Sequence, residues 1–425
     1  MKKLLFKILI ILSCLFFAHT TTLRIHVYYD KATAPSLLQM IHLIKQPQKD
    51  YKIVLWERFY KHMKNKQNYP NTLFPSNWDN LFKTVDKLIK EHPNAKIVLH
   101  HNLHHEYFFN AFIKRYPKQL ILESHAYEDA SGYVYWSKGR NYIFYNNPDI
   151  NHILHLWGDV EKLCEKNELS NCNEVKKLVQ NVKIEPIDYE KIAKTLTQEE
   201  IEKIADLTGI DLKKLKQQLG DKKNGIYVLG CVAGTNIDVL QLTALKDVCT
   251  QTKDISWYYK PHPSLRKTPS EKVLNSLCPN IKPIDAHLPF ELLILTRLQP
   301  TYVAGIGSSL FFNLNGQNIL KYIQRWNLDF YIPTLKKAGI LISDEQLITL
   351  EQAKQKFNEL NFIYLENNGW FIKVENEYCR MHSNECYKII SDNNQEKTVQ
   401  NNKGEHLKST FLKDYIWSNF EIVNE

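Results

Sequence analysis

The feature that most constrains the fold of this chain is an alternation of short apolar runs with amphipathic stretches, which occurs twice along the sequence. In the first alternation, which begins at residue 23, the expected strands are residues 23–29, 51–56, 95–100 and 119–123, and the expected helices are 34–44, 78–91 and 105–115. Such runs are typical of parallel strands that are covered by helices on both faces. The sequence therefore predicts an α/β fold.

The second alternation has expected strands at 225–230, 255–259 and 302–304, and expected helices at 238–249 and 288–298. Residues 151–221, between the two, are charged and contain no strand-like run, and Thr-Gln-Glu-Glu at 197–200 is typical of a capping box at a helix start. We therefore expect an N-terminal Rossmann-like domain with a helical end at 22–221 and a second one at 222–356. Residues 357–425 form a C-terminal extension, and its aromatic stretch at 411–420 is a candidate for packing back on the first domain.

The composition excludes several classes of protein. A chain of 425 residues with 44% apolar and 24% charged side chains is neither disordered nor a multispan membrane protein. The net charge of +9 is only mildly basic, and the aromatic residues are not interleaved with Lys/Arg stripes. A nucleic-acid partner is therefore not expected.

Residues 1–21 are expected to be a signal-like or membrane-anchor segment. Lys2 and Lys3 give a positive start, and residues 8–18 are an apolar run. This run is shorter than the roughly 20 residues that a transmembrane helix needs. Cys14 follows Ile-Leu-Ser and resembles a lipoprotein acylation site, or it is one more apolar residue of the run.

The eight cysteines have no CxxC or metal-finger spacing, so a structural zinc site on cysteine is not expected. Two pairs, Cys164/Cys172 and Cys379/Cys386, are close enough in sequence to form disulfides. The other cysteines stand singly in apolar surroundings, and we expect reduced, unpaired thiols.

Four clusters of polar residues follow expected strands or begin expected helices. Glu128 and Asp129 come after an apolar strand, where one carboxylate can face a cleft as a general base, although a solvated acidic turn is the alternative. In the motif Lys-Pro-His-Pro at 260–263, the prolines restrict the backbone around Lys260 and His262, or the motif is a strand exit with a surface histidine.

The other two clusters are Ser308 with Ser309, and Glu291. The serines stand at an expected helix start, where hydroxyl and backbone N–H groups can bind an anion or simply cap the helix. Glu291 is a lone acid in an apolar helix start, where it can bind a ribose diol or interact favourably with the helix dipole.

The order of these motifs resembles the bacterial sialyltransferases of glycosyltransferase family eighty, which have the two-domain GT-B fold with a central cleft. The motifs are Tyr-acid-acid at 127–129, Lys-x-His-Pro at 260–263, Pro-Phe-Glu-Leu-Leu at 289–293 and Gly-x-x-Ser-Ser-Leu-x-Phe at 305–312. The resemblance runs from residue 23 to about residue 340. It implies an inverting transfer of sialic acid from CMP-sialic acid to a galactoside hydroxyl, with no metal and no further cofactor.

The resemblance also implies roles for individual residues. Asp129 would be the general base, and His262 would donate to the leaving phosphate, which Ser308 and Ser309 would bind. Lys260, Pro263 and Glu291 would hold the nucleotide. Arg58, His105 and Glu128 would line the sugar side.

Two departures from the family pattern leave the acceptor and the linkage open. Ala130 stands where the family has glycine, and residues 229–236 lack the tryptophan that family members place beside the acceptor. Two alternatives remain: a transferase of another CMP-activated acid such as Kdo, and a non-catalytic glycan-binding protein on the GT-B scaffold.

The expected acceptor is a galactose-terminated surface glycan such as lipooligosaccharide. CMP-activated sugars are cytoplasmic, whereas the N-terminal segment resembles an export signal. We expect a membrane-associated protein at the inner membrane with cytoplasmic access to the donor, and a periplasmic or lipoprotein form is the alternative.

Overall fold

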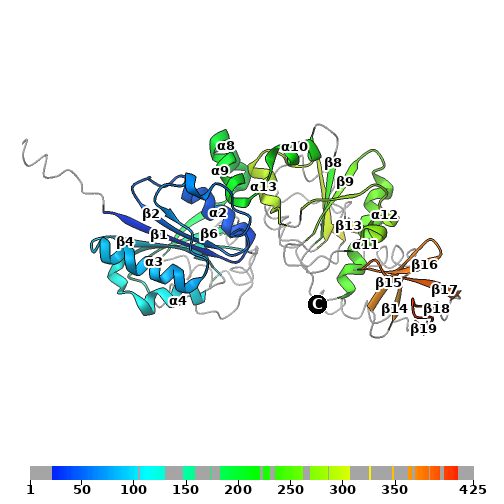
Figure 1. Ribbon diagram of the computed structural model, residues 1–425. Helices are drawn as coiled ribbons and strands as arrows, with labels where there is room; N and C mark the ends of the chain where they lie inside the picture. The colour runs from blue at the N-terminus through cyan, green and yellow to red at the C-terminus, as the bar shows by residue number, and fades with distance from the viewer. Residues whose placement is uncertain are drawn as a thin grey trace, which may run out of the picture. The chain divides into compact units, whose positions relative to one another are not determined.

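The computed structural model (Figure 1) describes most of the two α/β regions and part of the C-terminal extension. The described residues are 22–103, 106–129, 147–157, 173, 182–220, 224–229, 235–261, 269–285, 287–306, 325–326, 347–348, 362–365, 369–381, 383–392 and 397–409. They form two compact units. The first contains the described residues of 22–129, 147–155 and 182–185, and the second contains 156, 157, 173 and the described residues from 186 onward.

The first unit contains a seven-stranded sheet in the order β3-β2-β1-β4-β5-β6-β7. Each strand pair from β3 to β6 is parallel, as predicted. The strands are β1 (Arg24–Asp30), β2 (Tyr51–Trp56), β3 (Thr72–Leu73), β4 (Lys96–Asn102), β5 (Ile121–Tyr127), β6 (Asn151–Trp157) and β7 (Lys183–Ile187). The helices are α2 (Thr33–Ile44), α3 (Trp78–Glu91) and α4 (Glu106–Arg115), with 3-10 turns at Lys66–Asn68 and Lys118–Leu120.

Alternate residues of β1 face helices on opposite sides of this sheet. The ring of Tyr28 packs against His42 of α2, whereas the ring of Tyr29 stacks on Phe108 of α4 at 4.6 Å and meets Trp78 of α3 edge-on. Figure 1 shows α3 and α4 side by side along one face. This arrangement explains why β1 is buried along almost its whole length and has no solvent-exposed face.

The prediction that residues 151–221 contain no strand is wrong. Strand β6 pairs with β5 in parallel, and β7 follows it in the sheet. The polar residues of β6 concealed it, because His152 is buried and one of its ring nitrogens lies 3.0 Å from the backbone oxygen of Asn147. A buried strand tolerates such a side chain when it has a hydrogen-bond partner.

The helices expected at the end of the first domain belong to the second unit. They are α8 (Tyr189–Thr195), α9 (Gln198–Thr208) and α10 (Leu212–Leu219). The capping box of α9 is confirmed, with Thr197 and Glu200 each accepting from the other's backbone N–H group. The guanidinium of Arg297 donates to the backbone oxygens of Ala193 and Leu196 at 3.0 Å and ties these helices to the second unit.

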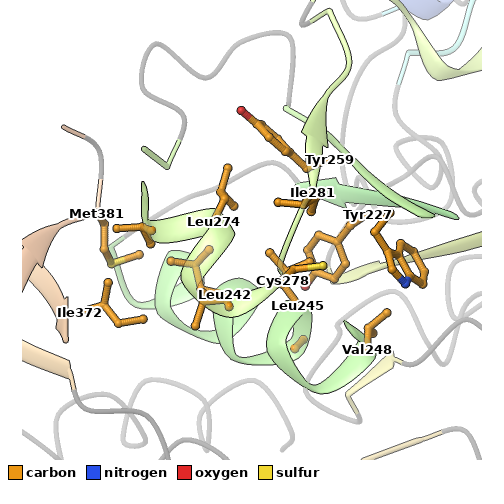
Figure 2. Packing of buried hydrophobic residues seen from close by; sticks show 14 of the residues in the cluster. Tyr227, Leu242, Leu245, Val248, Tyr259, Leu274, Cys278, Ile281, Ile372 and Met381 are labelled. Carbon is orange, nitrogen blue, oxygen red and sulfur yellow. The ribbon is translucent and has the colours of Figure 1, made fainter. Parts of the chain in front are cut away.

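The second unit contains a parallel four-stranded sheet in the order β10-β9-β8-β11. The strands are β8 (Asn224–Leu229), β9 (Ser256–Lys260), β10 (Lys282–Pro283) and β11 (Tyr302–Ile306), and the helices are α11 (Thr235–Gln251), α12 (Glu271–Leu277) and α13 (Phe290–Leu295). A small parallel pair joins β12 (Arg325–Trp326) to β13 (Leu347–Ile348). Figure 2 shows Tyr227 of this sheet packed with Leu242 and Leu245 of α11.

The C-terminal extension contains a six-stranded antiparallel sheet that the sequence did not predict. Its strands are β14 (Phe362–Leu365), β15 (Gly369–Val374), β16 (Glu377–Arg380), β17 (Cys386–Asp392), β18 (Lys397–Gln400) and β19 (His406–Lys408). Ile372 and Met381 enter the core formed by α11 and α12 (Figure 2), so this sheet packs on the second unit. The stretch at 411–420 lies outside the described residues.

The expectation of reduced thiols is wrong for four cysteines. One disulfide joins Cys249 of α11 to Cys278 at the end of α12, and another joins Cys379 to Cys386 across the β16–β17 pair. The first pair is 29 residues apart in sequence, a spacing that carries no signal. Cys164 and Cys172 lie outside the described residues, as does the N-terminal segment 1–21. Within the described part of the chain, no helix is long and apolar enough to cross a membrane.

We expect Gly305→Ala to destabilise the second unit. Gly305 of β11 has φ 151°, and an added Cβ would meet the backbone oxygen of Val228 on the adjacent β8. The backbone atom belongs to a paired strand and cannot move away without disrupting the pairing. Overpacking of this kind lowers the free energy of unfolding by about 1–3 kcal/mol, and backbone strain adds to that loss. Urea unfolding measures this loss.

Gly404→Ala is the matched control for this measurement. Gly404 also has a positive φ, of 83°, but its added Cβ would have only Gln400 Nε2 nearby, at 3.9 Å. The control carries the backbone strain without the clash. Equal losses in the two variants would contradict the prediction.

Candidate active site

Polar side chains gather at the carboxyl ends of three adjacent strands of the first sheet. Asp30 ends β1, Asn102 ends β4, and Asp129 follows β5 by two residues. The three strands are neighbours, since β4 pairs in parallel with β1 on one side and with β5 on the other. Their carboxyl ends therefore meet at one edge, which is where open α/β sheets bind their ligands.

The carboxyl group of Asp30 is completely buried and firmly held. Its Oδ1 accepts from the backbone N–H of Ala32 at 2.7 Å and from Asn102 Nδ2 at 3.3 Å, and its Oδ2 accepts from Gln39 Nε2 at 3.1 Å. The indole of Trp56 in turn donates to Gln39 Oε1 at 2.7 Å. Burial raises the pKa of Asp30 well above its usual range, and the negative charge of Asp129 raises it further.

Asp129 is partly exposed and has a pKa suited to proton transfer. Burial of its carboxyl group raises the pKa to about 6, against a hydrogen bond from Asn102 and the positive charge of Arg58, which both lower it. Asn102 therefore interacts with both carboxyl groups of the site. A carboxyl group with this pKa is mostly ionised at neutral pH and still basic enough to take a proton, as a general base must be.

The other two sequence-predicted residues of this edge differ in exposure. Arg58 is exposed in the turn after β2, and its Nε donates to the backbone oxygen of Lys31 at 2.6 Å. Glu128 is completely buried, and its backbone N–H donates to the oxygen of His155 at 3.0 Å. Of the two adjacent acids only Asp129 reaches the surface, which favours it as the base. A contact of Glu128 with substrate stays a prediction, and His105 lies outside the described residues.

In the second unit the structure brings Lys260 and Glu291 into electrostatic range. Lys260 ends β9 and is almost completely buried, with its Nζ donating to the backbone oxygen of Pro261 at 2.7 Å. Burial lowers the pKa of Lys260 to about 8, and the charges of Glu291 and Asp285 act against that decrease. Glu291 lies in the first turn of α13. The other predicted donor-side residues lie outside the described part: His262, Pro263, Ser308 and Ser309.

Sequence reasoning assigned no role to Asp30 and Asn102, although both bear directly on Asp129. The signal was present, because each is a polar residue that ends an apolar strand, as the pair at 128–129 does. What the sequence does not contain is the order of strands in the sheet. Only the placement of β4 between β1 and β5 makes Asp30 and Asn102 neighbours of Asp129.

Neither a family model nor a curated protein matches the sequence. Solved structures do match the fold. An α/β-galactoside α-2,3-sialyltransferase from Photobacterium phosphoreum superposes with a TM-score of 0.61 at 20% identity, over 78% of this chain and 99% of that one. The GT-B domain of a sialyltransferase from Photobacterium damselae gives 0.55 at 19% identity, over 77% of this chain and 100% of that one.

A third similar structure is a 2,6-sialyltransferase from Photobacterium sp. JT-ISH-224, solved with CMP and lactose. Its TM-score is 0.57 at 16% identity, over 77% of this chain and 78% of that one. The predicted α/β class is confirmed, and the chain has the GT-B fold of these bacterial sialyltransferases. The resemblance found in the sequence is thus confirmed for the fold.

We expect Asp129→Asn to stabilise the protein at neutral pH. The pKa of Asp129 rises from an ordinary 3.8 to about 6 on folding, so the folded state binds this proton more tightly than the unfolded chain. The carboxyl group therefore costs stability progressively as the pH rises from about 4 to about 6, by up to about 3 kcal/mol at pH 7. Urea unfolding between pH 4 and pH 7 measures the gain of the variant, which should vanish at the acid end.

Asp86→Asn is the control of opposite sign. Asp86 of α3 accepts from Arg115 and from the hydroxyl of Tyr116, and Arg115 lowers the pKa of Asp86 below its usual value. This carboxylate stabilises the fold above its unfolded pKa, so its removal should cost stability at pH 7 and not in acid. A loss of stability in Asp129→Asn that is the same at every pH would contradict the prediction.

Proposed function

We propose that the chain is an inverting sialyltransferase that moves sialic acid from CMP-sialic acid to a galactoside hydroxyl. The observation that carries the proposal is Asp129, a partly exposed residue whose carboxyl group has a pKa of about 6, at the carboxyl edge of a parallel sheet in a protein with this fold. The bound CMP and lactose named for the 2,6-sialyltransferase support a CMP-linked donor and a galactoside acceptor.

In the proposed reaction, Asp129 takes the proton of the acceptor hydroxyl as the acceptor oxygen forms its bond to the anomeric carbon. The bond from that carbon to the phosphate oxygen breaks, and CMP leaves with the bonding electron pair. A single displacement of this kind inverts the anomeric configuration. Asn102 holds the carboxyl group of Asp129, and Arg58 contributes positive charge beside it.

On the donor side, the proposal assigns proton donation to the leaving phosphate to His262 and phosphate binding to Ser308 and Ser309. It also assigns nucleotide binding to Lys260, Pro263 and Glu291, and binding on the sugar side to Arg58 and His105. Because the leaving group has a single phosphate, a lysine and fixed donors suffice to stabilise its charge, and the proposed transfer uses no metal.

The proposals for the acceptor and for the location of the enzyme rest on the family resemblance and on residues 1–21. We infer a surface glycan such as lipooligosaccharide as the acceptor, and association of the enzyme with the membrane surface. The short apolar run behind two lysines supports the membrane association.

We expect CMP to be released from CMP-sialic acid only when a galactoside such as lactose is present. Asp129→Asn should lower the rate about 10²–10⁴-fold while CMP still binds, since general-base catalysis contributes by that order. The wild-type rate should rise with pH through about 6, as Asp129 loses its proton. Glu128→Gln is the matched control, and it should cost much less because its side chain has no exposed surface.

Other outcomes separate the alternatives. Acceptor-dependent release from CMP-Kdo and none from CMP-sialic acid would assign the related donor. Galactoside binding without release from either donor would make the chain a glycan-binding protein. An inactive Glu128→Gln variant together with an active Asp129→Asn variant would identify Glu128 as the general base in place of Asp129.

We also expect the affinity for CMP to fall as the pH rises from about 7 to about 9. Lys260 has a pKa of about 8 and loses its positive charge in this interval. A hydrogen bond to a charged group contributes roughly 1.5–3 kcal/mol, so Lys260→Gln should bind CMP at least about tenfold more weakly at pH 7 and show a flat pH profile. Calorimetry measures both.

Lys272→Gln is the control, because Lys272 is a lysine of the same unit that pairs with Glu377 at 2.8 Å. Its affinity and pH profile should match those of the wild type. A sloping profile in Lys260→Gln would remove Lys260 from the nucleotide site.

A further inference from the structure

Three histidines of the first unit converge between α2 and the sheet, and none of them is among the residues assigned to transfer. His26 lies on β1, His100 on the adjacent β4 and His42 near the end of α2. In the β1–β4 register Tyr28 is opposite His100, and His26 lies on the same face of β1 as Tyr28. His26 is four residues before Asp30, a distance of roughly 13 Å along the strand.

Their ring nitrogens are spaced as the ligands of one metal ion would be. His26 Nδ1 and His100 Nε2 are 3.1 Å apart, and one nitrogen from each of the three rings lies within 4.8 Å of the others. Zn–N bonds of about 2.0–2.1 Å in a tetrahedral site place neighbouring nitrogens about 3.3 Å apart. The spacing of His26 and His100 already fits, and binding would require a small shift of His42, near the carboxyl end of α2, to bring its nitrogen to the same spacing.

The outward ring nitrogens face groups that suit metal-bound histidines. His100 Nδ1 lies 3.1 Å from the hydroxyl of Tyr127, and His42 Nδ1 lies 3.0 Å from that of Tyr28. His26 Nε2 is buried without a hydrogen bond, and the carboxylate of Asp50 is 3.8 Å from it. A ligating histidine usually presents its second nitrogen to a carboxylate, carbonyl or hydroxyl group, which orients the ring.

The surroundings keep the three rings neutral and nearly balance the local charge. Burial lowers the pKa of all three below the ordinary histidine value, that of His26 to about 3, so protons do not compete for the ligand nitrogens at neutral pH. Arg24 and Lys52 face His26 with positive charge, while Asp50 and Glu123 face it with negative charge. The further histidines that face the cluster, His125 and His155, belong to β5 and β6.

We propose that His26, His42 and His100 bind one divalent transition-metal ion, Zn²⁺ in the first place, which ties α2 to β1 and β4. Three imidazoles suit Zn²⁺, Co²⁺, Ni²⁺ and Cu²⁺ and do not suit Mg²⁺ or Ca²⁺, which prefer oxygen. A water or small anion completes the coordination. The amide of Gln46, which lies 3.1 Å from both ring nitrogens of His42, moves aside. The ion stabilises the fold and takes no part in transfer.

The test uses the full chain without a histidine tag, freed of metal by a chelator and titrated with Co²⁺ and then Zn²⁺. We expect one equivalent of Co²⁺ to bind with the visible absorption of a tetrahedral nitrogen site, and Zn²⁺ to displace it. The melting temperature should rise with Zn²⁺ concentration and not with Mg²⁺. Acceptor-dependent CMP release should be the same with and without the ion. The metal titration and the transferase assay therefore test the metal site and the proposed function separately.

His42→Gln should weaken Co²⁺ binding by more than about 100-fold, since the loss of an outer partner alone costs about 10–100-fold. His42 is partly buried and belongs to a helix, so its substitution removes no strand pairing. His406→Gln is the control, since His406 is exposed on β19 of the other unit. Wild-type protein that binds no stoichiometric Co²⁺, or His42→Gln that binds as tightly as the control, would overturn the proposal and leave a neutral, hydrogen-bonded histidine cluster.

Discussion

The parallel pairing of β1, β4 and β5 is the constraint on which the first half of the proposed site depends. It brings three strand ends to one edge, where Asp30 ends β1, Asn102 ends β4 and Asp129 follows β5 by two residues. Burial of the two carboxyl groups at this edge is the main cause of their raised pKa values, and the hydrogen bonds that they accept only partly offset it.

Periodicity predicted the elements whose polar and apolar residues are segregated. The bounds of β2 and α3 agree with prediction to the residue, because the apolar positions of α3, such as Leu81, Val85 and Leu88, recur at helical spacing. Strand β6 was missed because buried polar side chains with hydrogen-bond partners break that rule. The C-terminal sheet was missed because strands such as β17 and β19 are mostly exposed, so their apolar and polar residues do not separate into a buried and an exposed face.

The sequence was sufficient to predict those site residues whose position at the end of a strand is visible locally. It was insufficient for residues that matter only because the fold places them beside another site residue. Asp129 and Lys260 were predicted because each follows an apolar run. Asp30 and the histidine cluster were not, because residues from β1, β4 and α2 are far apart in sequence and meet only through the order of the strands. No local pattern contains that order.

The two acids at the carboxyl edge illustrate how the fold selects a base. Asp30 has the more strongly raised pKa, yet it is fully buried and its oxygens accept from Ala32, Gln39 and Asn102. A substrate cannot reach it, and its hydrogen bonds leave it little freedom to take a proton from outside. Desolvation also raises the pKa of Asp129, but this residue keeps some exposed surface. It therefore combines a basic carboxyl group with access for a substrate. Burial is the main cause of both raised pKa values, and the charge of Asp129 raises the pKa of Asp30 further, so Asp129 is the acid of the pair that ionises first.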